Sequence, residues 1–310
     1  MVFAQLNALF AGVLFATGDI VVDKVPPVRF AALMYLITAP VNTLWWWLTR
    51  RGYLPRIHPR PEGSGRRFTR HDALWVGIHS LCSVAGIALL WAGMARLETA
   101  VGSLLSRLEV VVAVMLGLAW LGERLSRPQW LGLIVTLAGA AIIRWTVLAG
   151  EPLGFLLLVL SALSFGLAEV TGKVAVRTVP VPKLVLIRGW VMLLCLVILA
   201  QALEPGWQSL TPTLWGLTVL SAFLGPVLSR NSYMLALSYL PVSLVVLLNQ
   251  TQPLYAALAA YLMRGEVPSR QTCLGGLVLL IGVAVLAWRH IDGARRRALG
   301  PSQATGGSSP

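Results

Sequence analysis

The sequence predicts an all-α integral membrane protein whose ten transmembrane helices form two inverted five-helix repeats, with both termini in the cytoplasm. Three observations lead to this prediction: the composition, the apolar segments and an internal repeat. Of the 310 residues, 57% are hydrophobic and only 12% are charged, a balance too apolar for a soluble domain. The formal net charge of +13 is assigned to loops that orient the chain in a membrane, so no nucleic-acid partner is expected.

Ten segments are apolar enough to cross the hydrocarbon core of a bilayer, which takes about 20 helical residues each. In chain order they lie near residues 3–22, 29–49, 72–95, 99–121, 128–147, 152–173, 183–203, 213–237, 242–263 and 271–289. Most connections between them are very short, so neighbouring helices are expected to be antiparallel. Residues 291–310 end in a Gly-, Ser- and Pro-rich stretch and are expected to form a disordered cytoplasmic tail.

The distribution of basic residues predicts the orientation, because cytoplasmic loops carry an excess of Arg and Lys. The loop after the second segment is rich in arginine: Arg50, Arg51, Arg56, Arg60, Arg66, Arg67 and Arg70. The same side collects the basic residues that follow the fourth, sixth and tenth segments. Both termini are therefore expected in the cytoplasm. Arginine far outnumbers lysine and alanine is abundant, which indicates a bacterial genome and hence the inner membrane.

Two stretches far apart in the chain match each other at a constant offset. The first is LGERLSRPQWLGLIVTLAGAA at 121–141, and the second is RGEVPSRQTCLGGLVLLIGVA at 264–284. In this alignment Gly139 falls on Gly282, and a Gly-Glu pair stands near the start of both stretches. The chain therefore contains an internal repeat.

The repeat extends upstream, where LLSRLEVVVA at 104–113 lies on LLNQTQPLYA at 247–256. We therefore predict two five-helix repeats, residues 1–147 and 150–290. An odd number of spans in each repeat inverts the second relative to the first. Inverted repeats are typical of secondary transporters, whose substrate site lies near the midplane of the membrane between the repeats.

Three further stretches are distinctive: AGMARLETAVGSLLSRLEVVVAVML, ALSYLPVSLVVLLNQTQPLYAALAA and SALSFGLAEVTGKVAVR. With these and the two Gly-Glu pairs, residues 3–290 resemble the drug/metabolite transporter superfamily, in particular its EamA-type members. The resemblance implies transport of small metabolites without ATP, and it does not specify the substrate. The family usually has proline after the polar residue of the fourth helix. Pro253 keeps this pattern in the ninth segment, but Val110 replaces it in the fourth, so no unwinding is expected there.

Arg107 and Glu109 lie inside the fourth segment, where one charge costs roughly 2.5–3.5 kcal/mol on insertion scales. On a continuous helix they would project about 200° apart, so they are not expected to pair. Glu109 shares a stripe of small residues with Ser106, and Asn249 and Gln252 occupy the equivalent positions of the second repeat. We predict that these residues form two walls of a central substrate-binding cavity. Alternatively, Glu109 is a buried carboxylate that holds helices together, and Arg107 is either a ligand anchor or a carboxylate partner.

Five other polar residues inside apolar segments are candidate site residues. Asp19 and Glu169 occupy nearly equivalent repeat positions and are candidates for the cavity or for proton coupling. Arg188, Arg230 and Asn231 are candidates for binding a carboxylate or phosphate of the substrate. The alternative is that these three pair with Glu169 or Asp19, or extend to the cytoplasmic surface.

The function that these features favour is a secondary active transporter, an exporter of a small polar metabolite across the cytoplasmic membrane by alternating access. The expected partners are the substrate, the lipid bilayer and a coupling proton, and the protein is a monomer or a homodimer. An integral membrane enzyme or a lipid-linked substrate carrier is the alternative. The sequence shows no nucleophile with a base and no metal-ligand set, so we expect no catalytic residues, no metal and no cofactor.

Overall fold

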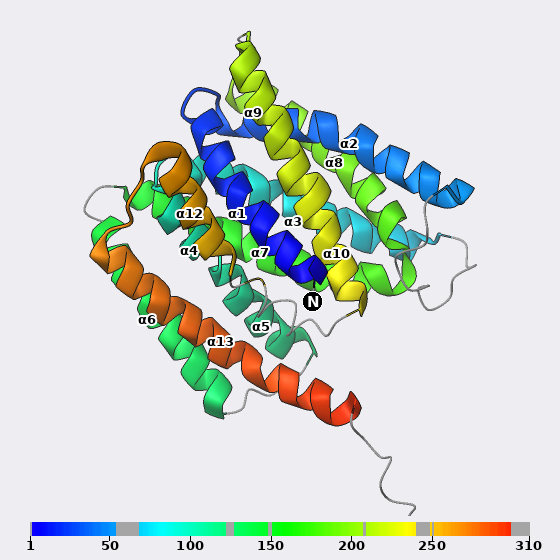
Figure 1. Cartoon of the computed structure of the whole chain (residues 1–310). Helices are drawn as coiled ribbons and strands as arrows, with labels where there is room; N and C mark the ends of the chain where they lie inside the picture. Colours follow the sequence, from blue (N-terminus) through cyan, green and yellow to red (C-terminus); the bar gives the residue numbers. More distant parts are fainter. Residues whose placement is uncertain are drawn as a thin grey trace, which may run out of the picture.

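The computed structural model describes residues 2–53, 68–121, 127–147, 151–206, 209–239, 249 and 251–298. Within these ranges all regular secondary structure is helical, as predicted (Figure 1). The first half of the chain contains α1 (Val2–Val22), α2 (Pro27–Arg51), α3 (Arg70–Met94), α4 (Thr99–Leu105), α5 (Leu108–Leu121) and α6 (Arg127–Val147). The second half contains α7 (Pro152–Thr178), α8 (Val181–Leu203), α9 (Pro212–Ala222), the π-helix η1 (Phe223–Ser229), α10 (Arg230–Tyr239), α12 (Gln252–Arg264) and α13 (Arg270–Ala298).

The helices follow the predicted segments closely. Seven of the predicted segments are single helices, α4 and α5 share the fourth, and α9, η1 and α10 share the eighth. The ninth is described from Asn249, and its earlier part lies outside the described residues. The last helix is longer than predicted, since α13 continues past Ile291 to Ala298 where a disordered tail was expected. The rest of that predicted tail, 299–310, lies outside the described residues.

Within the described residues, five helical stretches are long and apolar enough to cross a membrane: Val2–Val22, Arg70–Met94, Pro152–Val176, Val181–Leu203 and Pro212–Ala236. Two shorter apolar helices, Trp130–Ile142 and Arg270–Gly282, lie within α6 and α13. These stretches coincide with seven of the ten predicted segments. The chain is therefore a membrane protein with multiple apolar helices.

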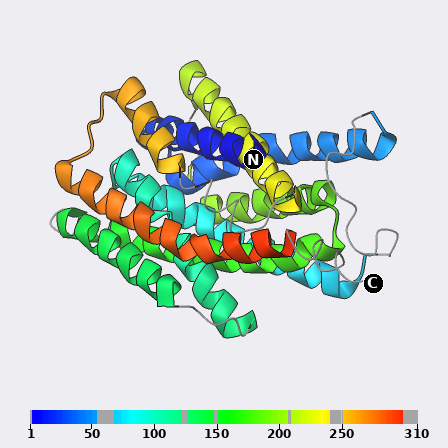
Figure 2. The ribbon, with the colours of Figure 1, turned by 60° about the horizontal axis from the view of Figure 1, so that its bottom comes forward.

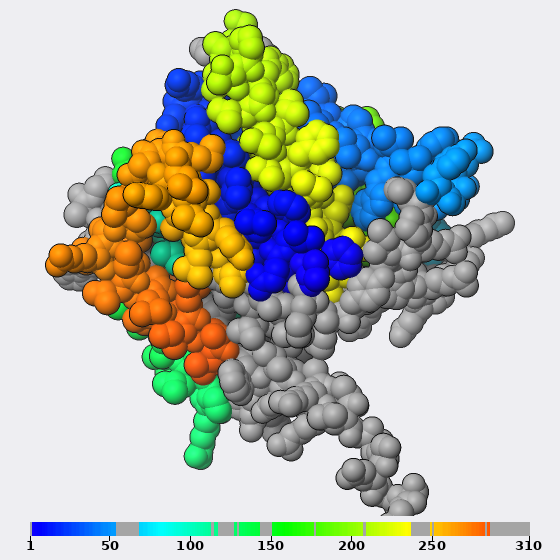
Figure 3. Space-filling view, viewed as in Figure 1, coloured from blue at the N-terminus to red at the C-terminus, as the bar shows by residue number. Residues whose placement is uncertain are grey.

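Contacts between the two halves of the chain come in matched sets. Two helix pairs, α6 with α13 and α2 with α8, join helices at the same place in each half (Figures 1 and 2). The pair α3 and α7 has its counterpart in the packing of α1 against α9, η1 and α10, and the pair α1 and α12 has its counterpart in α7 and α5. In the space-filling view α1 lies on the surface between α12 and the α9–α10 segment (Figure 3). The packing therefore follows the repeat seen in the sequence.

Glycines at matched positions bring the halves into backbone contact. A Cβ added to Gly139 would lie 2.3 Å from the backbone nitrogen of Leu279 on α13, and one added to Gly282 would lie 2.3 Å from that of Thr136 on α6. Closely packed helix pairs in membranes use small residues at the contact, because they let the two backbones approach each other. The packing of α6 on α13 therefore requires glycine at both positions.

A second glycine pair sets α1 and α7 against the helices that carry the predicted cavity residues. A Cβ on Gly12 of α1 would lie 2.9 Å from the backbone oxygen of Gln252, and one on Gly166 of α7 would lie 3.0 Å from that of Glu109. Glu109 and Gln252 are equivalent in the repeat. The two halves therefore meet in the same way at the two sides of the molecule's centre.

The fourth segment is broken at Ser106 and Arg107, which form a turn between α4 and α5. Here the backbone bonds span three residues instead of four: Arg107 N donates to Leu104 O at 3.0 Å and Val110 N to Arg107 O at 3.1 Å. The expectation of an uninterrupted helix, drawn from Val110 in place of proline, is wrong. The tighter bonds satisfy the backbone without proline, so the break falls where α12 begins in the second half.

The eighth segment widens in its middle rather than breaking. Its turn η1 contains Pro226, which has no N–H to donate. A π-turn accommodates this loss within a continuous helical path, and such turns are frequent at functional sites. Ser229 ends this turn and Arg230 begins α10.

Replacing Gly139 or Gly282 with alanine is predicted to destabilise the protein by about 1–3 kcal/mol, because the added methyl overlaps the backbone of the facing helix. We expect a lower thermal unfolding midpoint, Tm, for both variants in detergent. Gly77→Ala on α3 is the control, since nothing lies within 4 Å of its Cβ position and alanine favours a helix. Equal Tm values for all three variants would contradict the prediction.

Candidate central site

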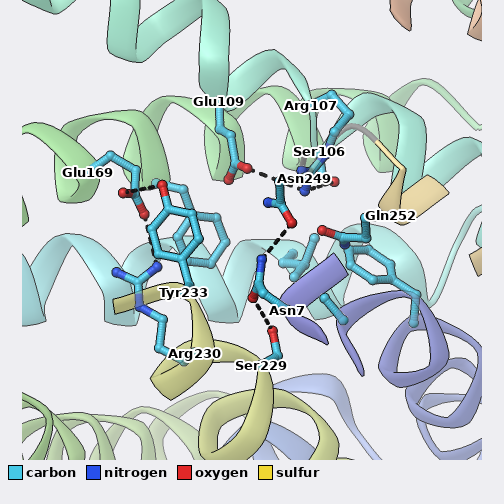
Figure 4. A pocket seen from close by; sticks show the side chains of 14 residues that line it. Asn7, Ser106, Arg107, Glu109, Glu169, Ser229, Arg230, Tyr233, Asn249 and Gln252 are labelled. Carbon is cyan, nitrogen blue, oxygen red and sulfur yellow. Dashed lines mark hydrogen bonds and ion pairs between the residues drawn. The ribbon is translucent and has the colours of Figure 1, made fainter. Parts of the chain in front are cut away.

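A cavity of about 150 Å³ lies where α1, α5, α7, α10 and α12 converge (Figure 4). This is room for about five water-sized groups of ~30 Å³ each, so it suits a small molecule. Its apolar lining is Ala11, Phe15, Leu90 and Phe165. Its polar lining is Asn7, Ser106, Arg107, Glu109, Glu169, Ser229, Arg230, Tyr233, Asn249 and Gln252.

One side of the cavity carries a chain of neutral hydrogen bonds. Ser229 Oγ donates to Asn7 Oδ1 at 2.7 Å, and Asn7 Nδ2 donates to Asn249 Oδ1 at 2.5 Å. All three residues are buried, and they come from three segments far apart in the sequence. Amide groups both donate and accept hydrogen bonds, so this side can bind ligand groups that are donors and ligand groups that are acceptors.

The turn in the fourth segment places two charges in the cavity. Arg107 Nη2 lies 3.3 Å from Glu109 Oε1 and donates to Ser106 Oγ at 3.3 Å. The prediction that these charges do not pair is wrong, because the turn changes the direction in which the two side chains project. Arg107 is 4% exposed, and its Nε and Nη1 have no hydrogen-bond partner among the described residues. Unpartnered N–H groups of a buried cation are costly.

The opposite side holds a second ion pair. Arg230 Nη1 lies 2.9 Å from Glu169 Oε1, and Tyr233 Oη donates to Glu169 Oε2 at 3.0 Å. The arginine also lies over the tyrosine ring, with its Cζ 5.3 Å from the centroid. Pairing of Arg230 with Glu169 was one of the alternatives predicted from the sequence. The pair lines the cavity, and binding of a substrate carboxylate or phosphate by Arg230 stays a prediction.

Three predicted site residues do not line this cavity. Asp19 lies farther along α1, where it accepts a bond from Thr99 Oγ1 at 2.7 Å and pairs with Arg264 at 2.8 Å. Arg264 also pairs with Asp23 and Glu266, each at 2.9 Å. Asp19 therefore belongs to an ion-pair cluster at one end of the bundle. Asp19 and Glu169 occupy nearly equivalent positions in the repeat, but Asp19 lies in this cluster whereas Glu169 lines the cavity.

The other two, Arg188 and Asn231, lie in a polar layer beside the cavity. Arg188 Nε donates to Ser83 Oγ at 3.2 Å, and Asn231 Nδ2 donates to Asn42 Oδ1 at 3.1 Å. Neither makes an ion pair with Glu169 or Asp19 in the described part of the chain, as one alternative had it. Arg188 is 6% exposed, so it does not extend to the cytoplasmic surface either.

Sequence reasoning missed three polar lining residues: Asn7, Ser229 and Tyr233. Asn7 had a usable signal, because an amide inside an apolar span marks a functional position by default. Ser229 stands next to Arg230, which was identified. A serine or tyrosine in an apolar helix is common, so nothing in the sequence separated Ser229 and Tyr233 from others of their kind.

The cavity combines balanced charge with neutral donors and acceptors. Two arginines and two glutamates face it, each arginine already paired with a glutamate. In the described residues, no group of three or more His, Cys, Asp or Glu side chains is placed to hold a metal ion. Such a lining can exchange its internal bonds for bonds to a small polar ligand.

Comparison with known proteins supports a transporter fold. The EamA-like transporter family matches the chain twice, over residues 1–145 and 152–288. A solved crystal structure that is 18% identical matches 96% of this chain and 99% of its own chain, with a TM-score of 0.62. No curated protein matches the sequence.

Arg230→Gln is predicted to lower stability by about 2 kcal/mol, because it leaves the partly buried Glu169 carboxylate without its cation. Adding Glu169→Gln to that variant should restore most of the loss. Thermal unfolding of wild type, both single variants and the double variant forms a double-mutant cycle that measures this coupling. A coupling near zero would show that the two charges do not stabilise each other.

Proposed function

The chain belongs to the EamA-like transporter family, and we propose that it is a secondary active transporter that exports a small polar metabolite. The substrate binds in the central cavity, where Asn7, Asn249 and Gln252 contact its polar groups. Glu109 and Arg107 exchange their mutual ion pair for contacts with the substrate. No ATP is used. Glu109 replaces Asp19 and Glu169 as the candidate for coupling transport to a proton, because Asp19 does not line the cavity and both oxygens of Glu169 are held by Arg230 and Tyr233.

The observation that carries this proposal is a polar cavity at the junction of broken helices in an apolar bundle. Backbone breaks at membrane depth are tolerated where they line a cavity or are buried in protein, and transporters place their substrate sites at such breaks. Here the break at Ser106 and the start of α12 at Gln252 both face the cavity. Polar groups from both halves of the chain therefore meet around one small space.

Alternating access is supported by the matched contacts between the halves. The main helix contacts made by one half have counterparts in the other, so a difference in conformation between the two halves can be exchanged between them at little cost in energy. Two inverted repeats, residues 1–147 and 150–290, that rock around a fixed site would use this property. We propose ten spans with both termini in the cytoplasm of a bacterial cell, and the inner membrane as the location.

Transport should depend on the cavity. Wild-type protein in liposomes loaded with an extract of bacterial metabolites is predicted to release at least one small polar compound, identified by mass spectrometry. We expect a release rate at least tenfold lower for Asn249→Leu, because leucine removes the amide that bonds Asn7. Glu109→Gln should abolish any dependence of the rate on a pH gradient.

The control is Ser164→Ala on α7, whose hydroxyl donates to the backbone carbonyl of Leu160 at 2.9 Å on the exposed face. Its transport rate should equal that of wild type. If no compound leaves these liposomes faster than it leaves loaded liposomes without the protein, the protein does not transport the metabolites in the extract. If Asn249→Leu and Glu109→Gln both transport normally, the substrate does not use this cavity.

The orientation is testable by fusion proteins. Green fluorescent protein placed after Ala298 should fluoresce, because it folds in the cytoplasm, and alkaline phosphatase there should be inactive. The same reporters placed after Gly206, between α8 and α9, should give the opposite result. The reverse pattern would show that the bundle has the opposite orientation in the membrane, with its C-terminus outside the cytoplasm.

A further inference from the structure

The charges buried around the cavity do not balance. Three arginines lie in this part of the bundle. Two of them are paired, the buried Arg107 with Glu109 and the partly buried Arg230 with Glu169. The third is Arg188, on α8. No carboxylate of the described residues lies within ion-pair distance of its guanidinium. The region therefore carries one buried positive charge more than it carries negative charges.

The contacts of Arg188 are to neutral groups. Its Nε donates to Ser83 Oγ at 3.2 Å, and its Cζ lies 5.7 Å from the centroid of the Tyr35 ring. Tyrosine and serine dipoles stabilise a cation far less than a carboxylate does. Moving an unpaired charge out of water costs several kcal/mol, and a cation inside a membrane bundle is retained where it has a function.

A carboxylate near Arg188, that of Glu169, is already engaged. Glu169 attracts Arg188, but Arg230 at 2.9 Å and Tyr233 at 3.0 Å hold both of its oxygens. Arg230 itself repels Arg188. Two arginines therefore share the attraction of a single glutamate, which makes the surroundings of Arg188 favourable for an anion.

Three polar atoms of the same layer have no hydrogen-bond partner in the described structure. His79 is fully buried on α3, and its Nδ1 lies 2.8 Å from the carbonyl oxygen of Ala168. Its Nε2 has no hydrogen-bond partner in the described structure, nor do Arg230 Nε and Asn231 Oδ1. Arg188 and Arg230 both act electrostatically on His79, so these groups share one neighbourhood. Buried polar groups without partners are rare and require an explanation.

We propose that Arg188, with Ser83 and Tyr35, forms a subsite beside the central cavity for a negatively charged group, so that the transported substrate is an organic anion. The carboxylate or phosphate of the substrate is the partner that Arg188 lacks. The guanidinium fork suits both groups, because it donates two parallel hydrogen bonds. The remainder of the substrate extends past the Arg230–Glu169 pair into the cavity. This inference rests on the proposed function, and it adds the chemical class of the substrate.

The test compares ligands that differ only in charge. Purified protein is unfolded thermally in detergent with benzoate, benzamide or benzylammonium, with acetate or acetamide, with methyl phosphate, and with sodium chloride at equal ionic strength. A ligand that binds the folded state raises Tm. We expect at least one organic anion to raise Tm by about 2 °C or more, and its uncharged or cationic counterparts to have no such effect.

Variants connect the effect to Arg188. Arg188→Gln should abolish the Tm increase, and Arg188→Lys should keep a weaker one. Without ligand, Arg188→Gln should be at least as stable as wild type, because it removes an unpaired buried charge. The matched control is Arg96→Gln, which changes an exposed arginine, 46% accessible and 3.8 Å from Glu151. It should retain the full increase.

The proposal fails if no organic anion raises Tm, if chloride is as effective as the organic anions, or if the increase survives in Arg188→Gln. It also fails if Arg188→Gln without ligand is markedly less stable than wild type, since Arg188 would then be structural. Transport that persists in Arg188→Gln with unchanged selectivity overturns this inference and leaves the transporter intact. Anion binding at Arg188 without any flux in liposomes would instead contradict the proposed function.

Discussion

Every polar group inside an apolar helix bundle must find its partner within the protein, and this constraint shapes the structure at each level. Along the helices, hydroxyl groups bond the carbonyl one turn back, as Thr38 does to Met34 and Thr136 does to Gly132, both at 2.8 Å. Where a side chain is larger or charged, partners come from distant segments, as in the bonds from Ser229 through Asn7 to Asn249. Of the eight buried side-chain atoms that have no hydrogen-bond partner in the described residues, five belong to the central cavity and the layer beside it. Hydrogen bonding of buried polar groups within the protein is therefore least complete at the site.

The fold was largely predictable because its signals are long and redundant. Apolar segments of about 20 residues mark the helices, and the offset that aligns Gly139 with Gly282 also identifies two residues that contact the facing backbone. The same alignment paired Ser106 with Asn249 and Glu109 with Gln252, all of which line the cavity. Their role as substrate ligands stays a prediction.

Three parts of the site were not predictable from sequence, and each depends on local backbone geometry or on tertiary packing. The Arg107–Glu109 pair depends on a turn that hydrogen bonds produce without the proline that usually marks such a break. Tyr233 lines the cavity because the π-turn at Pro226 sets the direction in which the side chains of α10 project. The sequence around a single tyrosine does not show that direction. Asp19 is a different case, because the sequence did offer a signal for its position and that signal was misleading. Its position in the repeat matched Glu169, but Asp19 lies in the last turn of α1, where it pairs with Arg264 instead of lining the cavity. Its role in proton coupling stays a prediction.

The two halves share a plan but differ in one chemical respect at their central breaks. Pro253 stands at the first turn of α12 and has no N–H, so the chain before it cannot join α12 through a complete set of helical hydrogen bonds. At the matching place in the first half, Val110 has its N–H and donates it to Arg107. Rotation of a few backbone dihedrals at Ser106 and Arg107 would turn α4 and α5 into one uninterrupted rod and separate the charges of Arg107 and Glu109. The two breaks therefore differ in their hydrogen bonding: the backbone groups at Ser106 and Arg107 can form the full set of helical bonds, whereas Pro253 always leaves one bond unmade.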